Sequence, residues 1–320
     1  MTKDCLPPDF ELRLKEILPQ RPASIFESRL YQSFRINTLK ITVEEAFDLL
    51  ASRKVDFQKV GFCPYAVIVA KPAAQELLRS DLVNDGFLYA QGLESLLPVI
   101  VLDPRPNERV LDLCAAPGSK TSQIAMHMNN QGFLKANEPI AKRLYRLRAV
   151  LQLTNAKAQI SSIDGRRLGS SGAGRHLKEH EGLYDRILVD APCSCEGRFI
   201  INEPKSLAYW SVRKIKEMSH KQKGLLLNAS RLLSPGGTLV YATCTFAPEE
   251  NEEVVDWFLR KTEGRFELAP IQIEGVTTYP CLTQWHERSY DPRIRDAARI
   301  LPDERMEGFF IAKFKNSHYK

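Results

Sequence analysis

The stretch RVLDLCAAPGSKTSQIAMHM, from Arg109 to Met128, decides the fold expected for this chain. It begins with apolar residues typical of a buried strand and ends with residues spaced as on an amphipathic helix. Small residues, a proline and a glycine join the two parts and favour a tight connection. A strand that leads directly into a helix is the first half of a βαβ unit, so this stretch predicts a sheet with parallel strands.

The same alternation of strand and helix continues towards the C-terminus. Strands are predicted over residues 132–138, 156–164, 184–190 and 237–244, and helices over residues 139–153, 209–233 and 248–262. A last hairpin-like pair of strands involves residues 308–315. Helices of this length between strands are typical of a doubly wound, mostly parallel sheet, so we predict an α/β fold.

The residues before this alternation have a different character. A strand is predicted over residues 34–40, an amphipathic helix over residues 42–53 and another strand over residues 65–70. Short mixed elements of this kind indicate a small α+β domain. We therefore expect a small N-terminal domain over residues 1–84 and a larger α/β domain over residues 85–320.

Length and composition exclude several classes of protein. The chain has 320 residues, of which 43% are hydrophobic, and this is enough for a sizeable core. No apolar run approaches the ~20 residues of a membrane span, and the charged start MTKDCLPPDFELRLKEIL is unlike a signal peptide, so a cytoplasmic protein is expected. The 7 cysteines are odd in number and scattered, which argues against a disulfide framework. Cys193 and Cys195 form only a CxC pair, so no metal is expected, and nothing in the sequence demands more than a monomer.

The formal net charge of +6 is only mildly basic, but positive charge is concentrated in one segment. Between residues 205 and 231 the positive residues are Lys205, Arg213, Lys214, Lys216, Lys221, Lys223 and Arg231, against Glu217 alone. This segment is either a solvated helix face or a surface that contacts phosphates, and the sequence leaves both readings open.

Polar or reactive residues stand at or just after the ends of five predicted strands. They are Cys114, Glu138, Asp164, Asp190 and Cys244. In open α/β sheets, ligands bind beyond the carboxyl ends of the strands. We therefore predict that this edge of the sheet is the functional one.

The loop from Leu111 to Thr121 lacks the G-x-G-x-x-G of a dinucleotide fold and the GK[ST] of a P-loop. Its small residues, Ala115 to Gly118, allow a ligand close to the backbone, and the helix that follows offers free amide groups to a carboxylate. Glu138 is placed to bind a ribose diol, and Asp164 to accept a hydrogen bond from an adenine amino group. Each acid alone is equally explained as a helix cap, but together with the loop they indicate S-adenosylmethionine.

Two cysteines follow strands, Cys193 in the segment DAPC and Cys244 in the segment YATC. Carbon 5 of cytosine is too weak a nucleophile to take a methyl group until a thiolate adds to carbon 6 and makes the ring an enamine. Loss of the proton at carbon 5 then expels the thiol. Each cysteine alone is equally explained as a buried structural residue, but the pair beside Asp190 favours this chemistry.

Several segments resemble the signatures of one family. LDLCAAPGSKT, DAPCSCEGRF and YATCTFAPEENE, with FRINTLK, GFLYAQGLESLLPV and RILPDERMEGFFIAKF, are similar to those of the RNA (cytosine-5) methyltransferases of the RsmB/NOP/Sun type. The resemblance extends from about Phe34 to Phe314. It implies a Rossmann-like class I methyltransferase domain, S-adenosylmethionine as methyl donor, and RNA as the partner of both domains.

The resemblance also implies roles for single residues. Cys244 would be the nucleophile and Cys193 would assist release of the adduct. Asp190 would hydrogen-bond the cytosine ring, and Lys120 would lie in the active site. The methyl donor would be bound by Cys114, Ala115, Ala116, Pro117, Gly118, Lys120, Glu138, Arg143, Asp164 and Asp190. The choice of attacking cysteine rests on the family alone, since DNA cytosine methyltransferases use a PC thiol; Cys195 departs from the DAPCSG of many relatives.

A target base must leave its stack to reach a thiol, so the enzyme needs phosphate contacts and aromatic surfaces. The predicted RNA contacts are Arg35 and Asn37 in the small domain, with Arg29 beside them, and Arg213, Lys214, Lys216, Lys221 and Lys223 on the helix after the DAPC loop. Tyr209 and Trp210, which open that helix, are assigned to the core rather than to a base.

The leading hypothesis is therefore an RNA cytosine-5 methyltransferase, with ribosomal and transfer RNA both open as substrates. The same chemistry on DNA is one alternative, and the order of the two cysteine motifs and the N-terminal unit argue against it. A non-catalytic RNA-binding or assembly factor is the other. Loss of Cys244 or Asp190 would have indicated such a factor, and both are present.

Overall fold

The computed structural model describes residues 6–19, 26, 29–169, 184–201, 203–208 and 210–317. The larger domain contains the parallel strands β5 (Arg109–Asp112), β6 (Phe133–Asn137), β7 (Gln159–Ser161), β8 (Tyr184–Asp190) and β9 (Leu233–Thr243). Its antiparallel strands are β10 (Phe266–Ala269), β13 (Ala298–Ile300) and β14 (Phe309–Asn316). The sheet order is β10-β14-β9-β8-β5-β6-β7, with β13 paired to β14. The predicted doubly wound, mostly parallel sheet is confirmed.

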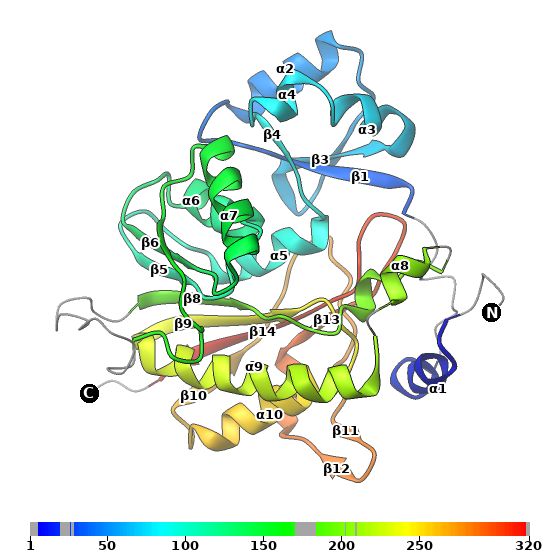
Figure 1. Ribbon diagram of the computed structural model, residues 1–320, viewed down its shortest axis with the longest axis vertical. Coiled ribbons are helices and arrows are strands. Elements are labelled where there is room, and N and C mark those ends of the chain that lie inside the picture. Colours follow the sequence, from blue (N-terminus) through cyan, green and yellow to red (C-terminus); the bar gives the residue numbers. More distant parts are fainter. Residues whose placement is uncertain are drawn as a thin grey trace.

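Helices cover both faces of this sheet (Figure 1). α5 (Leu93–Leu102), α6 (Ser119–His127) and α7 (Ala141–Thr154) lie on one face, and α9 (Val212–Leu232) and α10 (Glu252–Lys261) on the other. Alternate residues of a strand serve the two faces. Leu188 and Val240 pack in the cluster that includes α5 and α6, whereas Val189 and Tyr241 pack in the cluster that includes α9 and α10. This alternation is expected of strands that are buried on both sides.

Shorter elements complete the larger domain. They are α8 (Pro204–Leu207), the hairpin of β11 (Gln284–Trp285) and β12 (Arg288–Ser289), and 3-10 turns at Glu196–Arg198 and Pro292–Asp296. The long helix predicted over residues 209–233 starts at Val212, because the side chain of Ser211 accepts a hydrogen bond from the amide of Lys214 and caps it.

The small domain is an antiparallel sheet with helices on it, at the top of Figure 1. Its strands are β1 (Tyr31–Ile36), β2 (Gln58–Val60), β3 (Cys63–Ala70) and β4 (Leu88–Ala90), in the order β2-β3-β1-β4. Its helices are α2 (Val43–Ser52), α3 (Lys71–Leu77) and α4 (Asp81–Asn84). α2 begins in a capping box, in which the side chains of Thr42 and Glu45 each accept the other's backbone amide.

Both limits of the small domain differ from the expected range of 1–84. At its end, β4 adds a strand beyond residue 84, so the sheet closes only at Ala90. At its start, α1 (Pro8–Ile17) lies beside the larger domain, away from the small one (Figure 1). Phe10 packs edge-on against Phe199 and Trp210, with ring centroids 5.0 and 5.5 Å away. The apolar face of α1 is therefore buried in the core of the larger domain.

Among the described residues, every helix is too short or too polar to span a bilayer.

Candidate active site

A cavity of about 750 Å³ opens at the carboxyl ends of β5, β6, β8 and β9. The predicted site residues that line it are Cys114, Ala115, Ala116, Pro117, Lys120, Glu138, Arg143, Asp164, Asp190, Cys193, Lys221 and Cys244. Gly118 caps the start of α6 beside it, with a φ of 116° that suits glycine. Residues from separate strands thus meet at the edge of the sheet where the sequence placed them.

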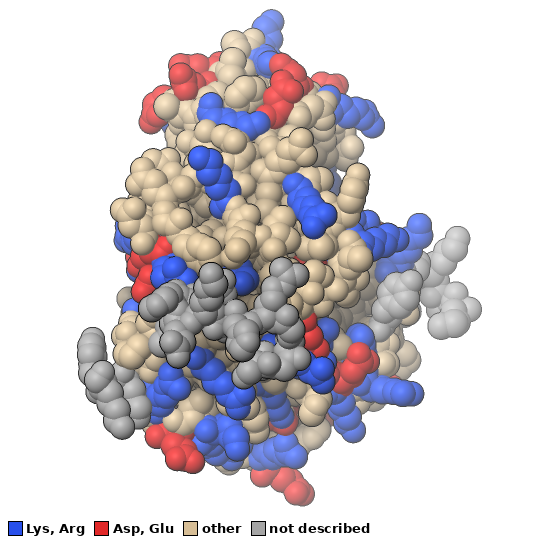
Figure 2. All heavy atoms as spheres, turned by 60° about the vertical axis from the view of Figure 1, so that its left-hand side comes forward, with Lys and Arg blue, Asp and Glu red and all other residues tan. Residues whose placement is uncertain are grey.

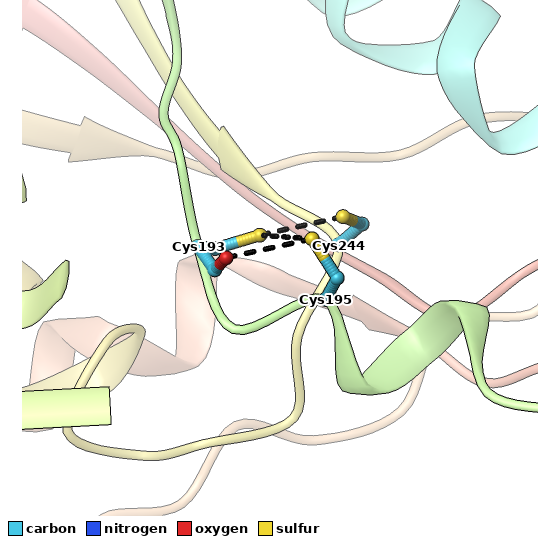
Figure 3. Close-up of side chains that lie close together, drawn as sticks. All are labelled: Cys193, Cys195 and Cys244. Carbon is cyan, nitrogen blue, oxygen red and sulfur yellow. Dashed lines mark hydrogen bonds between the residues drawn. The ribbon is translucent and has the colours of Figure 1, made fainter. Parts of the chain in front are cut away.

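Three thiols face one another on one side of this cavity (Figure 3). The Sγ atoms of Cys193 and Cys244 lie 3.3 Å apart, and those of Cys193 and Cys195 lie 3.9 Å apart. All three Sγ atoms lie within 4.8 Å of one another. We call Cys193, Cys195 and Cys244 the thiol cluster.

The thiols of the cluster have unequal acidities. The pKa of Cys195 is lowered, because the other two thiols donate hydrogen bonds to its thiolate and because Arg198 and Arg143 are nearby. The pKa of Cys193 is raised by its hydrogen bonds to those neighbours and by burial. The hydrogen bond from Cys193 favours ionisation of Cys244. The contact of Cys244 with Cys195 and the burial of Cys244 outweigh this effect, so the pKa of Cys244 is raised. The three thiols therefore titrate together: the first ionisation leaves one negative charge in the cluster, and this charge opposes ionisation of a second thiol.

Buried carboxylates join the two loops that carry the cysteines. Glu196 accepts hydrogen bonds from Trp210 Nε1 at 2.8 Å and from Thr245 Oγ1 and the amide of Phe246, both at 3.0 Å. Glu250 accepts from the amide of Ser194 at 3.1 Å, and burial raises its pKa to about 8. The backbones of the two loops therefore stay in register, which holds the thiols together.

The same loops are braced from the C-terminal segment. Arg299 makes a two-pronged ion pair with Glu252, with both N–O distances 2.6 Å, and donates to the carbonyl of Phe246 at 3.0 Å. The amide of Gly308 donates to the carbonyl of Gly197 at 2.9 Å, and a Cβ on Gly197 would meet the carbonyl of Gly308. Glycine is required at this close approach, because any side chain would separate the two backbones.

An ion pair between the buried Lys120 and the half-buried Asp190 lines the same cavity. Lys120 Nζ lies 2.8 Å from Asp190 Oδ2 and donates to Ser95 Oγ at 2.9 Å. Burial alone would lower the pKa of Lys120, but the charge of Asp190 and its hydrogen bond raise it, so the lysine stays protonated. Asp190 is in turn fixed in place and keeps its second oxygen for another donor.

The remaining part of the cavity is suited to a nucleoside with an amino-acid tail. Glu138 is almost fully buried, pairs with Arg143 at 3.2 Å, and still borders the cavity. Arg143 also donates to the carbonyl of Ala116 at 2.7 Å, which shapes the loop. Among the described residues, Asp112 Oδ1 has no hydrogen-bond partner although it is buried, and burial raises the pKa of this acid to about 7. An orphaned carboxylate oxygen at this position fits a ligand ammonium group.

Asp164 lies in the cavity wall as predicted, but it also has a local partner. Arg166 pairs with it at 2.6 Å, and the hydrogen bonds from this arginine lower the pKa of Asp164 to about 2. Asp164 can therefore hold its own loop as a local cap and still contact a ligand in the cavity.

The structure corrects two of the predicted RNA contacts. Arg35 is fully buried, donates to Ser122 Oγ at 2.6 Å, and has its pKa lowered to about 10 by burial. Asn37 is 1% exposed and donates to the carbonyls of Gly86 and Thr154 at 2.8 and 2.9 Å. Both side chains hold the small domain against α6 and α7 and do not reach a surface that RNA can touch.

The basic residues of α9 divide into groups. Arg213 and Lys216 are exposed, Lys221 borders the cavity, and Lys214 pairs with Glu217 on its own helix. Lys223 pairs with Glu253 of α10 at 2.9 Å. Figure 2 shows the side of the molecule that lies on the left in Figure 1. Lys and Arg gather over its lower part, with fewer acidic side chains between them. Trp210 packs against the core as predicted, while Tyr209 lies outside the described residues.

The cavity also contains residues that sequence reasoning did not single out. They include Lys71, Ser95, Asp112, Arg198, Arg305, Glu307 and Phe309. Arg305, Glu307 and Phe309 stand in the segment RILPDERMEGFFIAKF, whose likeness to the family was the one available signal. With Arg29, which also lines the wall, these cavity residues add four cations, of which Arg198 pairs with Glu307 and Arg305 with Glu304.

Known proteins resemble this chain over most of its length. Residues 99–315 match the family described as 16S rRNA methyltransferase RsmB/F. A tRNA (cytosine(49)-C(5))-methyltransferase of Pyrococcus abyssi is 37% identical over 89% of this chain and 88% of its own length. Ribosomal RNA small subunit methyltransferase F of Cronobacter sakazakii is 33% identical over 98% of this chain, which spans only 64% of that protein.

A solved structure shares the whole architecture. The methyltransferase homolog protein from Pyrococcus horikoshii superposes with a TM-score of 0.81 at 30% identity, over 96% of this chain and 94% of its own. The larger domain accordingly has the Rossmann-like class I methyltransferase fold that the sequence predicted. With a family match over residues 99–315 and a relative of 37% identity, this chain belongs to the RsmB/F family of RNA methyltransferases.

Proposed function

We propose that this protein transfers a methyl group from S-adenosylmethionine to carbon 5 of a cytosine in ribosomal or transfer RNA, through a transient bond between Cys244 and the base. The observation that supports this most strongly is the 3.3 Å approach of the Cys193 and Cys244 sulfurs in a cavity that also contains Asp190 and Lys120. Relatives named for tRNA and for ribosomal RNA are both similar to the chain, so both substrates stay within the proposal.

S-adenosylmethionine, when bound, supplies an electrophilic methyl group. For its binding, Glu138 offers a carboxylate to the ribose hydroxyls, and Asp112 Oδ1 offers an acceptor to the ammonium group. The small residues from Ala115 to Gly118 bring the backbone close, and the positive φ of Gly118 turns the chain directly into α6. Asp164 remains the candidate for the adenine amino group.

Cys244 must first lose its proton, which its raised pKa opposes. The Cys193 thiol, 3.3 Å away, donates a hydrogen bond that stabilises the thiolate, and the proton of Cys244 passes to solvent in the cavity. The Cys244 thiolate then adds to carbon 6 of the cytosine, and the displaced electron pair makes carbon 5 nucleophilic. Asp190, positioned by Lys120, accepts a hydrogen bond from the amino group of the base.

Release reverses the addition. A water molecule in the cavity takes the proton from carbon 5, and the electrons of that bond restore the ring double bond. The bond between carbon 6 and sulfur then breaks, and its electron pair returns to Cys244. Cys193 is placed to donate a hydrogen bond to the departing thiolate, which lowers the cost of that negative charge. Removal of Cys193 is therefore expected to stall the reaction after methyl transfer.

Two cysteine variants test the mechanism. Cys244→Ala is expected to abolish methyl transfer and adduct formation and to retain S-adenosylmethionine binding, measured by calorimetry. Cys193→Ala is expected to accumulate a protein–RNA species of low mobility on a denaturing gel. Cys281→Ala removes a buried thiol outside the cavity and is the matched control. Full activity of Cys244→Ala, or a trapped species that persists in the double variant Cys193→Ala/Cys244→Ala, would refute the assignment.

The kind of nucleic acid is tested separately. Transcribed RNA and a DNA of the same sequence are compared as methyl acceptors, and RNA alone is expected to be modified. Bisulfite sequencing of total RNA from cells with and without the gene then identifies the cytosine. Location in the cytoplasm and action as a monomer remain predictions.

A further inference from the structure

The thiol cluster contains one cysteine more than the proposed reaction uses. Attack and release need Cys244 and Cys193, whereas Cys195 has no part in either step. Cys195 nevertheless turns its sulfur towards the other two (Figure 3), 3.9 Å from that of Cys193. Its backbone has a φ of 62°, a left-handed conformation that is unfavourable for a residue with a side chain.

We infer that Cys193, Cys195 and Cys244 form a binding site for a single thiophilic cation of the Zn²⁺ type, which shuts off the active site while it is bound. The spacing of Cys193 and Cys195 alone predicted no metal. The fold changes this expectation, because it brings Cys244 from a different strand to complete a set of three sulfur ligands.

The distances agree with such a site. Zinc binds thiolate sulfur at about 2.3 Å in a tetrahedron, which places two sulfur ligands about 3.8 Å apart. The observed separations are 3.9 Å for Cys193–Cys195 and 3.3 Å for Cys193–Cys244, and the third pair lies within 4.8 Å. Displacements of the sulfur atoms by less than about 1 Å bring all three pairs to the required spacing. All three cysteines line the cavity, so the fourth ligand would come from the cavity, as in zinc sites that retain an open place.

The chemistry of the ligands selects the cation. Three sulfurs favour zinc and other thiophilic ions over Mg²⁺ or Ca²⁺, which prefer oxygen. The balance is one divalent cation bound and up to three protons released, because the metal binds thiolates. The complex would carry one net negative charge, which Arg198 and Arg143 on the cavity wall offset. No oxidant or reductant is involved.

Occupancy of this site has a direct consequence, which rests on the proposed function. A cation held by Cys193 and Cys244 leaves neither sulfur free for cytosine, so binding of the metal and attack on RNA exclude each other.

The full-length protein is tested under a phosphine reductant, without RNA or methyl donor. Cd²⁺ is the spectroscopic probe, because thiolate-to-cadmium charge transfer absorbs in the ultraviolet, and Zn²⁺ competition gives its affinity. The expected result is one Cd²⁺ per chain with three thiolates. Cys195→Gly is the decisive variant, since glycine accepts the left-handed backbone at this position without strain. Loss of an outer-shell partner already costs about 10–100-fold in metal affinity, so loss of this direct ligand is expected to cost at least as much.

Cys114→Ala is the matched control, because it removes a thiol of the same cavity outside the cluster and should leave Cd²⁺ affinity unchanged. A missing charge-transfer band, or equal affinity in wild type and Cys195→Gly, would overturn the site. Methyl transfer is measured in parallel with and without Zn²⁺, each variant relative to its own metal-free rate, and inhibition should weaken in Cys195→Gly. A wild type that binds Cd²⁺ as expected but transfers no methyl group in chelator would refute the proposed function and leave the metal site standing.

Discussion

Replacement of Arg299 by methionine is expected to destabilise the protein strongly. Arg299 is 2% exposed, its partner Glu252 is fully buried, and two N–O contacts of 2.6 Å join them. After Arg299→Met, Glu252 keeps only one donor described here, the amide of Leu282 at 3.0 Å. A buried charge that loses its partner costs about 3–5 kcal/mol, and the carbonyl of Phe246 loses a donor as well.

Urea unfolding of matched variants measures this cost. Arg53→Met breaks the exposed pair between Arg53 and Asp81 and should leave the free energy of unfolding almost unchanged. The double variant Arg299→Met/Glu252→Gln removes both charges of this pair and keeps an acceptor for the amide of Leu282. It should therefore recover about 2 kcal/mol of the loss, within the range of measured interaction energies. The reasoning fails if Arg299→Met costs no more than Arg53→Met, or if the double variant recovers nothing.

Three further outcomes are expected. Glu250 has a pKa of about 8 when folded against an ordinary value of 4.5, so the folded state binds a proton that the unfolded state releases. Stability should thus fall as pH rises from about 4.5 to about 8, and Glu250→Gln should flatten this slope in urea titrations at several pH values. Arg213→Gln with Lys216→Gln should weaken RNA binding and reduce its dependence on salt, whereas Lys223→Gln, which removes a lysine paired with an acid, should change the salt slope less; equal slopes would contradict this. Gly197→Ala should lower the thermal midpoint by several degrees and methyl transfer with it, since its Cβ has no room, and a wild-type midpoint would show that the loop can shift.

The order of the parallel strands was predictable because strand and helix patterns alternate along most of the chain after Arg109, whereas β10 and the β11–β12 hairpin were not predicted. The meeting of Glu138, Asp190 and Cys244 followed from the same rule, since parallel strands end at one edge of their sheet. Local pattern and a general rule of sheet topology were sufficient for this half of the site.

Other features depend on which surfaces pack against each other, and the sequence does not reveal that. Arg35 and Asn37 have side chains of the kind that contact RNA, yet α6 and α7 cover them. α5 contains Pro98 and is buried on nearly all sides. Its sequence therefore lacks the alternation of polar and apolar faces that would have predicted a helix. The third thiol of the cluster is likewise visible only once Cys195 and Cys244 are seen together.

The two buried side chains that join the domains have a mechanical consequence. Arg35 donates to Ser122 in the first turn of α6, after the loop proposed to bind the methyl donor. Asn37 donates to Thr154 in the last turn of α7, whose first turn carries Arg143. The small domain and the proposed donor site therefore both contact the helices α6 and α7. RNA bound to the small domain, as the sequence predicts, would therefore act on the two helices that border the proposed donor site.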